Sequence, residues 1–150
     1  MRAVIQRVRH ASVVIDQKEE RKISTGLLVL LGITHTDTLK DAEWICGKIA
    51  RMRIFADAAG QMNLSLTETG GEILLISQFT LHASSKKGNR PSFIEAARPE
   101  TALPLYEKCN EILQTLLPGK IKTGEFGADM QVSLTNDGPV TIIIDSVNPE

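Results

Sequence analysis

Apolar runs of strand length occur in the first half of the chain, separated by polar segments. Residues 3–8 and 11–15 are short, β-rich and partly alternating, which predicts two opening strands. Residues 27–33 are a continuous apolar run without a charge, and residues 72–76 are a second such run after its first residue, Glu72. Such runs are typical of strands that are buried on both faces. The pattern therefore predicts a β-rich core.

Two other stretches have helical periodicity. Apolar side chains recur at helical spacing over residues 38–52, and Thr38 with Asp41 resembles a capped helix start. A second helix is predicted to begin near Pro99 and to end at Pro118. Together with the strands, these helices predict a mixed α/β domain in which two helices cover a mostly β core.

The segment between the second apolar run and the second helix, residues 82–97, lacks periodicity and predicts a long exposed loop. Loops of this length inside a compact domain are often functional. Lys86, Lys87 and Arg90 form a small basic group within it. These side chains either belong to an ordinary solvated loop or bind a few phosphates.

Residues 131–135 and 140–144 predict two final strands. The four residues between them, at 136–139, are Asn, Asp, Gly and Pro, and each of these types favours a turn. Only about 5–6% of X–Pro bonds in folded proteins are cis. Composition alone therefore predicts a trans turn that joins the two strands.

The formal net charge of the 150-residue chain is -1. Proteins that wrap long stretches of nucleic acid usually carry a basic excess, because phosphate contacts supply most of the affinity. Any RNA contact should therefore be small and local, such as one exposed end. The sequence has no membrane-length apolar stretch and no signal-peptide pattern at its start, which predicts a cytoplasmic location and no membrane partner.

The residues that most often carry nucleophilic or metal chemistry show no decisive pattern. Cys46 and Cys109 lie among apolar residues of the predicted helices and are expected to be buried free thiols, with a catalytic thiol or a disulfide as the alternatives. The histidines have no metal-ligand spacing: His10, His35 and His82. A Ser-His-Asp arrangement that uses Ser77 and His82 rests only on their proximity in sequence.

Polar side chains stand where the second buried run ends: Ser77, Gln78 and Thr80. A strand holds such side chains rigidly at the surface, which suits a binding or catalytic site. The same residues could equally form the polar end of an ordinary strand. From these residues alone the chain is a small α/β domain with one polar site.

Two motifs together carry a resemblance. Ser-Gln-Phe-Thr-Leu at residues 77–81 and Asn-Asp-Gly-Pro-Val-Thr at residues 136–141 resemble the paired signatures of the D-aminoacyl-tRNA deacylases, also called D-tyrosyl-tRNA deacylases. The similarity continues through residues 6–8, 11–13, 26–30, 53–55, 60–63, 88–93 and 123–130. It implies one domain over residues 1–150, with mixed β-sheets packed partly barrel-like and two helices on one side, in β/β/α layers.

The resemblance also implies an activity and an assembly. The expected enzyme is a hydrolase of translation quality control that cleaves D-amino acids from tRNA and needs no metal or organic cofactor. A homodimer is expected to bind the tRNA acceptor end at the subunit interface, where residues 77–80 of one chain face a cis Gly138–Pro139 unit of the other. The implied catalytic residues are Thr80, Phe79, Gln78 and Ser77, and the implied substrate-binding residues are Gly138, Pro139, Arg7, Asn136, Thr141, Met130 and Phe126.

Two mechanisms are compatible with hydrolysis of an aminoacyl ester. Either the Thr80 hydroxyl attacks, or the tRNA 2′-hydroxyl assists while the Phe79 backbone N–H stabilises the oxyanion. The second is favoured because no base adjoins Thr80 in the sequence. Carbonyl groups of the Gly–Pro unit that reject an L side chain would still admit glycine, so glycyl-tRNA is an expected second substrate.

Three other functions compete with this one. A non-catalytic nucleic-acid-binding module would need more positive charge than the chain carries. A hydrolase of small esters using Ser77 or Thr80 would turn over model esters without RNA. A purely structural dimer would leave the paired motifs without a purpose.

Overall fold

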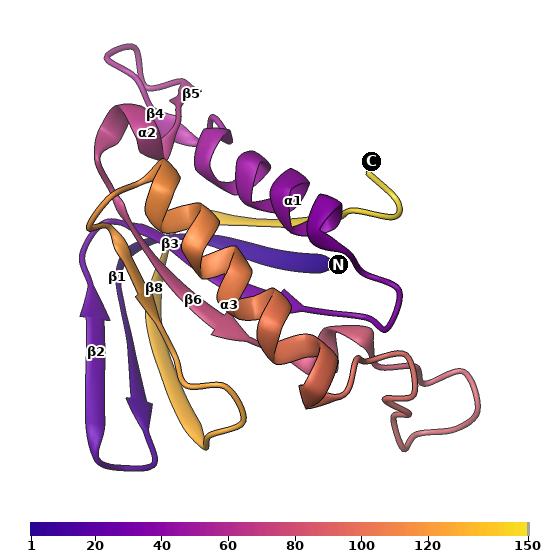
Figure 1. The fold of residues 1–150 in the computed structure, drawn as a ribbon. Helices are drawn as coiled ribbons and strands as arrows, with labels where there is room; N and C mark the ends of the chain where they lie inside the picture. Colours follow the sequence, from indigo (N-terminus) through magenta and orange to yellow (C-terminus); the bar gives the residue numbers. More distant parts are fainter. Residues whose placement is uncertain (150) are drawn as a thin grey trace.

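The computed structural model describes residues 1–149 and shows a strongly curved sheet with two long helices on one side (Figure 1). The strands are β1 (Arg2–Ile15), β2 (Glu19–Ile23), β3 (Gly26–Gly32), β4 (Phe55–Ala56), β5 (Met62–Leu64), β6 (Glu72–Ser77), β7 (Ile121–Thr123) and β8 (Met130–Asp145). The helices are α1 (Leu39–Arg51), α2 (Leu66–Thr69), α3 (Pro99–Leu116) and the 3₁₀ helix η1 (Phe79–His82).

Strand β1 organises the main sheet, whose order is β2-β1-β3-β6-β7, with β8 paired to the other edge of β1. The second half of β1 pairs with β2 and its first half with β3, whereas β8 runs antiparallel along nearly its whole length. Strands β3, β6 and β7 are parallel to one another. The short hairpin of β4 and β5 lies apart from this sheet.

The sheet curls until its two ends approach each other. Arg21 of β2 donates from Nη1 to the carbonyl oxygen of Thr123 in β7 at 2.7 Å, and Lys122 Nζ donates to the carbonyl oxygen of Lys22 at 2.6 Å. The interior of this nearly closed barrel holds one apolar cluster, which includes Val8, Val13, Leu28, Leu74 and Ile76. The barrel-like packing implied by the resemblance is confirmed.

A larger apolar cluster lies between the sheet and the two long helices. The helix predicted at residues 38–52 is α1, and its start is a capping box in which Asp41 accepts hydrogen bonds from the backbone N–H and the hydroxyl of Thr38. The second predicted helix is α3, which begins at Pro99. Both cover one face of the sheet, so the predicted layers are confirmed. Within residues 1–149, no helix has the length and apolarity needed to span a membrane.

The two cysteines face each other across the helix layer. Cys46 of α1 and Cys109 of α3 are buried and free, as predicted. The Cys109 side chain and then burial raise the pKa of the Cys46 thiol. A thiol with a raised pKa is a poor nucleophile at neutral pH, which argues against a catalytic role for Cys46. Both cysteines are part of the apolar core by their burial.

The structure corrects several sequence predictions. The two opening strands are one continuous strand, β1, with register shifts against β8 near Val8. The turn predicted at residues 136–139 is wrong, because these residues lie inside β8, both halves of which pair with β1. The Gly138–Pro139 bond is cis, as the resemblance implied and composition did not.

Six short elements were not predicted: β2, β4, β5, β7, α2 and η1. Strand β2 reads Glu-Glu-Arg-Lys-Ile, and only Ile23 is buried. A strand at the end of a sheet can expose most of its side chains, so it has little hydrophobic signal.

Candidate functional site

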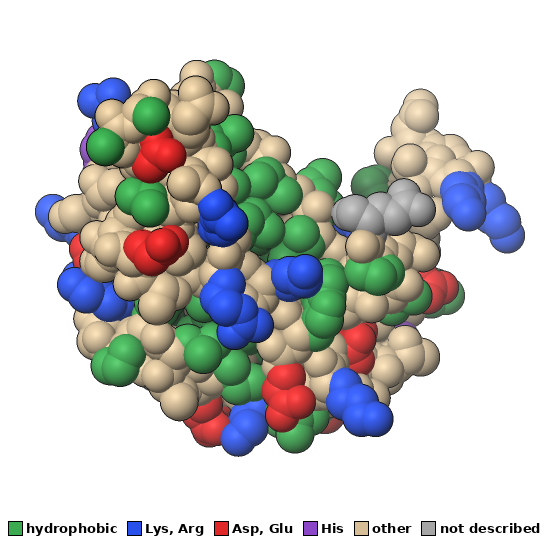
Figure 2. Space-filling model, turned by 90° about the horizontal axis from the view of Figure 1, so that it is seen from above, with side chains coloured by type: hydrophobic (Ala, Val, Ile, Leu, Met, Phe, Trp, Pro, Cys, Tyr) green, Lys and Arg blue, Asp and Glu red, His purple; other side chains and the backbone are tan. Residues whose placement is uncertain are grey.

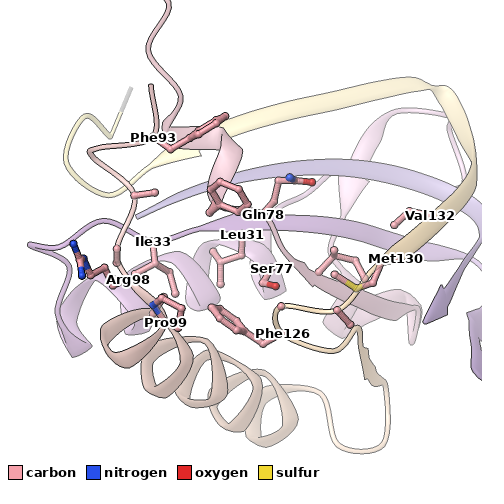
Figure 3. Close-up of a pocket in the computed structure, with 17 residues that line it drawn as sticks. Leu31, Ile33, Ser77, Gln78, Phe93, Arg98, Pro99, Phe126, Met130 and Val132 are labelled. Carbon is pink, nitrogen blue, oxygen red and sulfur yellow. The ribbon is translucent and has the colours of Figure 1, made fainter. Parts of the chain in front are cut away.

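A pocket of about 600 Å³ opens where β6 ends (Figure 3). Its walls are mostly apolar and come from distant segments: Leu31 of β3, Phe93 and Pro99 near the start of α3, and Phe126 and Met130 near the start of β8. Ser77, Gln78 and Arg98 add polar groups. An apolar cavity with a few polar groups is typical of a small-ligand site.

Residues 77–80, here called the rim turn, leave the buried strand β6 at the edge of this pocket. The Gln78 N–H donates to the Leu31 carbonyl oxygen at 2.8 Å, which holds the turn against β3. Gly32 permits this approach, because a Cβ there would lie 3.0 Å from the Gln78 oxygen and from His82 Cδ2. The rim turn is therefore positioned by backbone packing against β3.

Two backbone N–H groups of the rim turn are available to a ligand. Phe79 and Thr80 are the first residues of η1, and the first N–H groups of a helix have no partner within it. Over residues 1–149, neither N–H donates to another protein group. Both residues are exposed. Free adjacent N–H groups of this kind can stabilise a developing negative charge.

The side chains of the rim turn contain no evident general base. The Gln78 amide Nε2 donates to Thr80 Oγ1 at 2.5 Å, and an amide cannot take the proton of the hydroxyl. His82 is buried in η1, and its Nε2 has no partner among the described residues. No hydrogen bond joins Ser77 to His82 within residues 1–149, so the structure does not form the serine arrangement considered from sequence.

Arg2 anchors the rim turn from outside the pocket, through Leu81, the residue that follows the turn. Its Nη1 donates to the carbonyl oxygen of Leu81 at 2.8 Å, and its Nε donates to Asp145 Oδ2 at 3.0 Å. Burial raises the pKa of Asp145, but hydrogen bonds from the Val147 N–H and from Arg2 hold that pKa below its ordinary value. Sequence reasoning missed Arg2, since an arginine in an alternating strand carries no signal of its role.

The second predicted motif occupies an irregular stretch of β8, residues 136–141, here called the β8 bend. Arg7 donates from Nε to the Asp137 carbonyl oxygen at 3.0 Å and from Nη1 to the Ile54 carbonyl oxygen at 2.6 Å. Gly138 and Pro139 are exposed. Arg7 therefore braces the β8 bend from within its own chain.

Asn136 closes the β8 bend across its base. Its Oδ1 accepts the Val140 N–H at 2.9 Å, and its Nδ2 donates to Thr141 Oγ1 at 2.8 Å. Gly138 has φ +131°, a conformation that L side chains rarely adopt. At Gly138 the bend thus presents backbone without a side chain at its surface.

The predicted site residues fall into two groups within one chain. The pocket contains Ser77, Gln78, Phe79, Phe126 and Met130, with Thr80 on the adjoining turn. The β8 bend and β1 contain the others, none of which lines the pocket: Arg7, Asn136, Gly138, Pro139 and Thr141. A single chain therefore does not bring the two motifs into one cavity.

Phe93 is a pocket residue that the sequence did not single out. Its ring packs edge-on against Phe79, with centroids 5.1 Å apart. Phe93 lies in the segment 88–93, which contributed to the resemblance, and that was its only signal. In the part of the chain that the structure describes, no three His, Cys, Asp or Glu side chains gather as they would around a metal ion.

Comparison with protein families and curated proteins gives consistent matches. The family described as D-Tyr-tRNA(Tyr) deacylase matches residues 4–145. A D-aminoacyl-tRNA deacylase of Cytophaga hutchinsonii is 65% identical over 150 residues and covers 100% of both chains. One from Bacteroides fragilis is 58% identical over 151 residues, also with 100% coverage of both.

Two solved structures have similar folds. The c-Myc DNA unwinding element binding protein has a TM-score of 0.91 and 43% identity, with coverage of 97% of this chain and 98% of that one. A probable eukaryotic D-amino acid tRNA deacylase has a TM-score of 0.84 at 15% identity, with coverage of 95% and 97%. The second likeness concerns the fold alone.

Proposed function

The chain belongs to the D-Tyr-tRNA(Tyr) deacylase family, and on that premise we propose that it is a chiral proofreading enzyme acting at the acceptor end of tRNA. Its activity is that of a D-aminoacyl-tRNA deacylase, a hydrolase that releases the amino acid from tRNA. Action on aminoacyl-tRNA would place it in the cytoplasm.

The free N–H groups of Phe79 and Thr80 at the pocket rim carry the proposed mechanism. The terminal adenosine enters the apolar pocket, and its ester carbonyl lies at the rim turn. Water adds to the carbonyl carbon, and the Phe79 N–H stabilises the resulting oxyanion. The acyl–oxygen bond then breaks, and the ribose oxygen leaves with a proton.

The tRNA 2′-hydroxyl, rather than Thr80, is proposed to assist the proton transfer. Support comes from the Gln78 amide, which donates to the Thr80 hydroxyl and cannot act as its base. Replacing Thr80 by Ala should therefore lower kcat but leave measurable hydrolysis. Complete loss of hydrolysis in a folded Thr80→Ala protein would instead assign the attack to Thr80.

Chiral selection is proposed to require a second copy of the chain. The β8 bend exposes Gly138 and Pro139 but contributes nothing to its own chain's pocket. In a homodimer, the partner's cis Gly–Pro unit would face the rim turn. Its carbonyl oxygens would accept hydrogen bonds from the substrate amino group and leave no space for an L side chain. Because glycine has no side chain, glycyl-tRNA would not be excluded and would also be hydrolysed.

The direct experiment compares hydrolysis of D-tyrosyl-, L-tyrosyl- and glycyl-tRNA by catalytic amounts of the purified protein, with the oligomeric state measured by sedimentation. The proposal expects cleavage of the D-tyrosyl and glycyl esters by a dimer, and survival of the L-tyrosyl ester. If the folded dimer cleaved none of them, enzyme action would be excluded in favour of non-catalytic nucleic-acid binding.

A further inference from the structure

The loop between η1 and α3 projects beyond the body of the molecule, next to the pocket (Figure 1). Ser84 and Ser92 pair at its base, each N–H donating to the carbonyl oxygen of the other at 2.8 Å. Residues 85–91 beyond this pair are all exposed and are here called the finger. The two hydrogen bonds give the finger a defined base.

The base of the finger is also tied to the pocket rim. Phe93 packs against Phe79 of the rim turn. The Nε2 atom of His35 lies 3.0 Å from the Ile94 carbonyl oxygen, and the Ala97 N–H donates to the Ile33 carbonyl oxygen at 2.9 Å. The finger therefore extends from a fixed position beside the rim turn.

The charge of the finger differs from that of the whole chain, whose net charge is -1. The finger carries Lys86, Lys87 and Arg90, and no Asp or Glu occurs from Ile73 to Ile94. None of these three cations forms an ion pair with a carboxylate of residues 1–149. Figure 2 shows the outlying projection with Lys and Arg side chains on its outer side.

We propose that the finger binds backbone phosphates of the tRNA acceptor end whose terminal ester lies at the rim turn. This inference rests on the proposed function and extends it to nucleotides outside the pocket. When the last nucleotide of an RNA occupies the pocket, the nucleotides before it must pass the pocket rim, and the finger lies beside that rim. The finger holds no large apolar side chain, which disfavours insertion into a lipid surface or an apolar protein contact.

The reach of the finger matches a few nucleotides. Three residues on each side of its tip extend about 10 Å from the serine pair, before the lengths of the Lys and Arg side chains are added. Three phosphate contacts would make kcat/KM fall about 20- to 40-fold between about 50 mM and about 200 mM salt. Free cations at the end of a fixed loop therefore provide a short, local RNA contact.

The test uses the triple variant K86Q/K87Q/R90Q and a control triple, K18Q/K40Q/K120Q, which removes the same charge from exposed lysines that do not line the pocket. Each protein is assayed with D-tyrosyl-tRNA at both salt concentrations and with D-tyrosyl-adenosine, which has no phosphate. For the finger variant at low salt, KM for the tRNA should rise at least about 10-fold with kcat within about twofold, and the salt dependence should largely disappear.

The adenosine ester should be cleaved equally by all three proteins. An equal rise of KM in the control triple would assign the effect to overall charge and overturn the inference. A loss on the adenosine ester in the finger variant would overturn it too, because the finger would then shape the pocket itself. Wild-type protein that cleaves neither ester would refute the proposed function, whereas wild-type activity with an unchanged finger variant would refute only the phosphate contact.

Discussion

The rim turn and the β8 bend carry the two signature motifs, but they are held in different ways. The rim turn follows a buried strand, and its path is set by backbone contacts, such as the Gln78 N–H on the Leu31 carbonyl. The β8 bend lies within a strand that pairs with β1 on both sides of residues 137–140, and side chains hold it: Arg7 on one side and Asn136 across its base.

This difference shows where each motif is vulnerable. A backbone-held turn tolerates changes in its own side chains, because its position depends on the sheet beneath it. A bend that is held by side chains loses its shape when one of them is removed. Substitutions around the β8 bend should therefore have larger effects than those around the rim turn.

The largest effect is expected for Gly138→Val. A Cβ at this position would lie 2.9 Å from Val140 Cγ2 and 3.0 Å from Arg7 Nη2, at a φ of +131°. The bend must shift, and misplacement by about 1 Å can cost about 100-fold in rate. We expect at least about that loss in kcat/KM for D-tyrosyl-tRNA, with a cooperative thermal transition retained.

Gly119→Val is the matched control, because Gly119 also has a positive φ, +74°, but no atom of residues 1–149 would lie within 4 Å of its Cβ. It should be destabilised by about 1–3 kcal/mol while kcat/KM is unchanged. Unaltered D-specific activity in the Gly138 variant would contradict the role of the bend in the site.

A smaller effect is expected for Arg7→Met. This change leaves the carbonyl oxygens of Asp137 and Ile54 without the arginine donor. Each buried carbonyl oxygen that is left without a partner costs about 1–3 kcal/mol of stability. We expect kcat/KM to fall about 10-fold and the midpoint of urea unfolding to drop. Arg9→Met is the control, because the Arg9 side chain is 73% exposed and, within residues 1–149, forms a hydrogen bond only with the Asp137 carboxylate. Similar losses of kcat/KM in the Arg7 and Arg9 variants would mean that positive charge near the bend, and not the hydrogen bonds of Arg7, supports activity.

Arg2→Met tests the rim turn and should have a still smaller effect. Loss of the hydrogen bond to the Leu81 carbonyl loosens the turn while its contact with β3 remains. We expect kcat to fall about 3- to 10-fold with KM little changed. Arg2→Lys keeps one donor and should recover part of kcat. If instead KM rose and kcat held, Arg2 would act on substrate binding and not on the position of the turn.

The smallest effect concerns pH and Asp145, whose pKa is lowered in the folded chain. Such a carboxylate binds fewer protons when folded, so its contribution to stability is complete above its unfolded pKa of about 3.9 and is lost as pH falls through the folded pKa. Urea unfolding at a series of acidic pH values should show a shallower loss of stability in Asp145→Asn than in the wild type. If the free energy of unfolding depended on pH in the same way in both proteins, this contribution of Asp145 would be refuted.

Several parts of the fold followed from local patterns. The Thr38–Asp41 capping box, the apolar face that includes Cys46, and the buried runs of β3 and β6 have signals within a few residues, and the structure confirms them. Strand β2 has no such signal, because only one of its residues is buried. Composition also misled at residues 136–139, where turn-forming residues lie inside a strand that long-range pairing with β1 holds extended.

The sequence by itself determined the family, the two helices, the buried strands and the identity of both motifs, because each depends on neighbouring residues or on a contiguous match. Only the tertiary structure decided that β8 continues through the Gly–Pro unit, that Arg2 anchors the rim turn, and that the two motifs lie in separate places within one chain. These features depend on contacts between residues far apart in sequence. Periodicity and composition describe only local preference, so they carry no information about which distant segments meet.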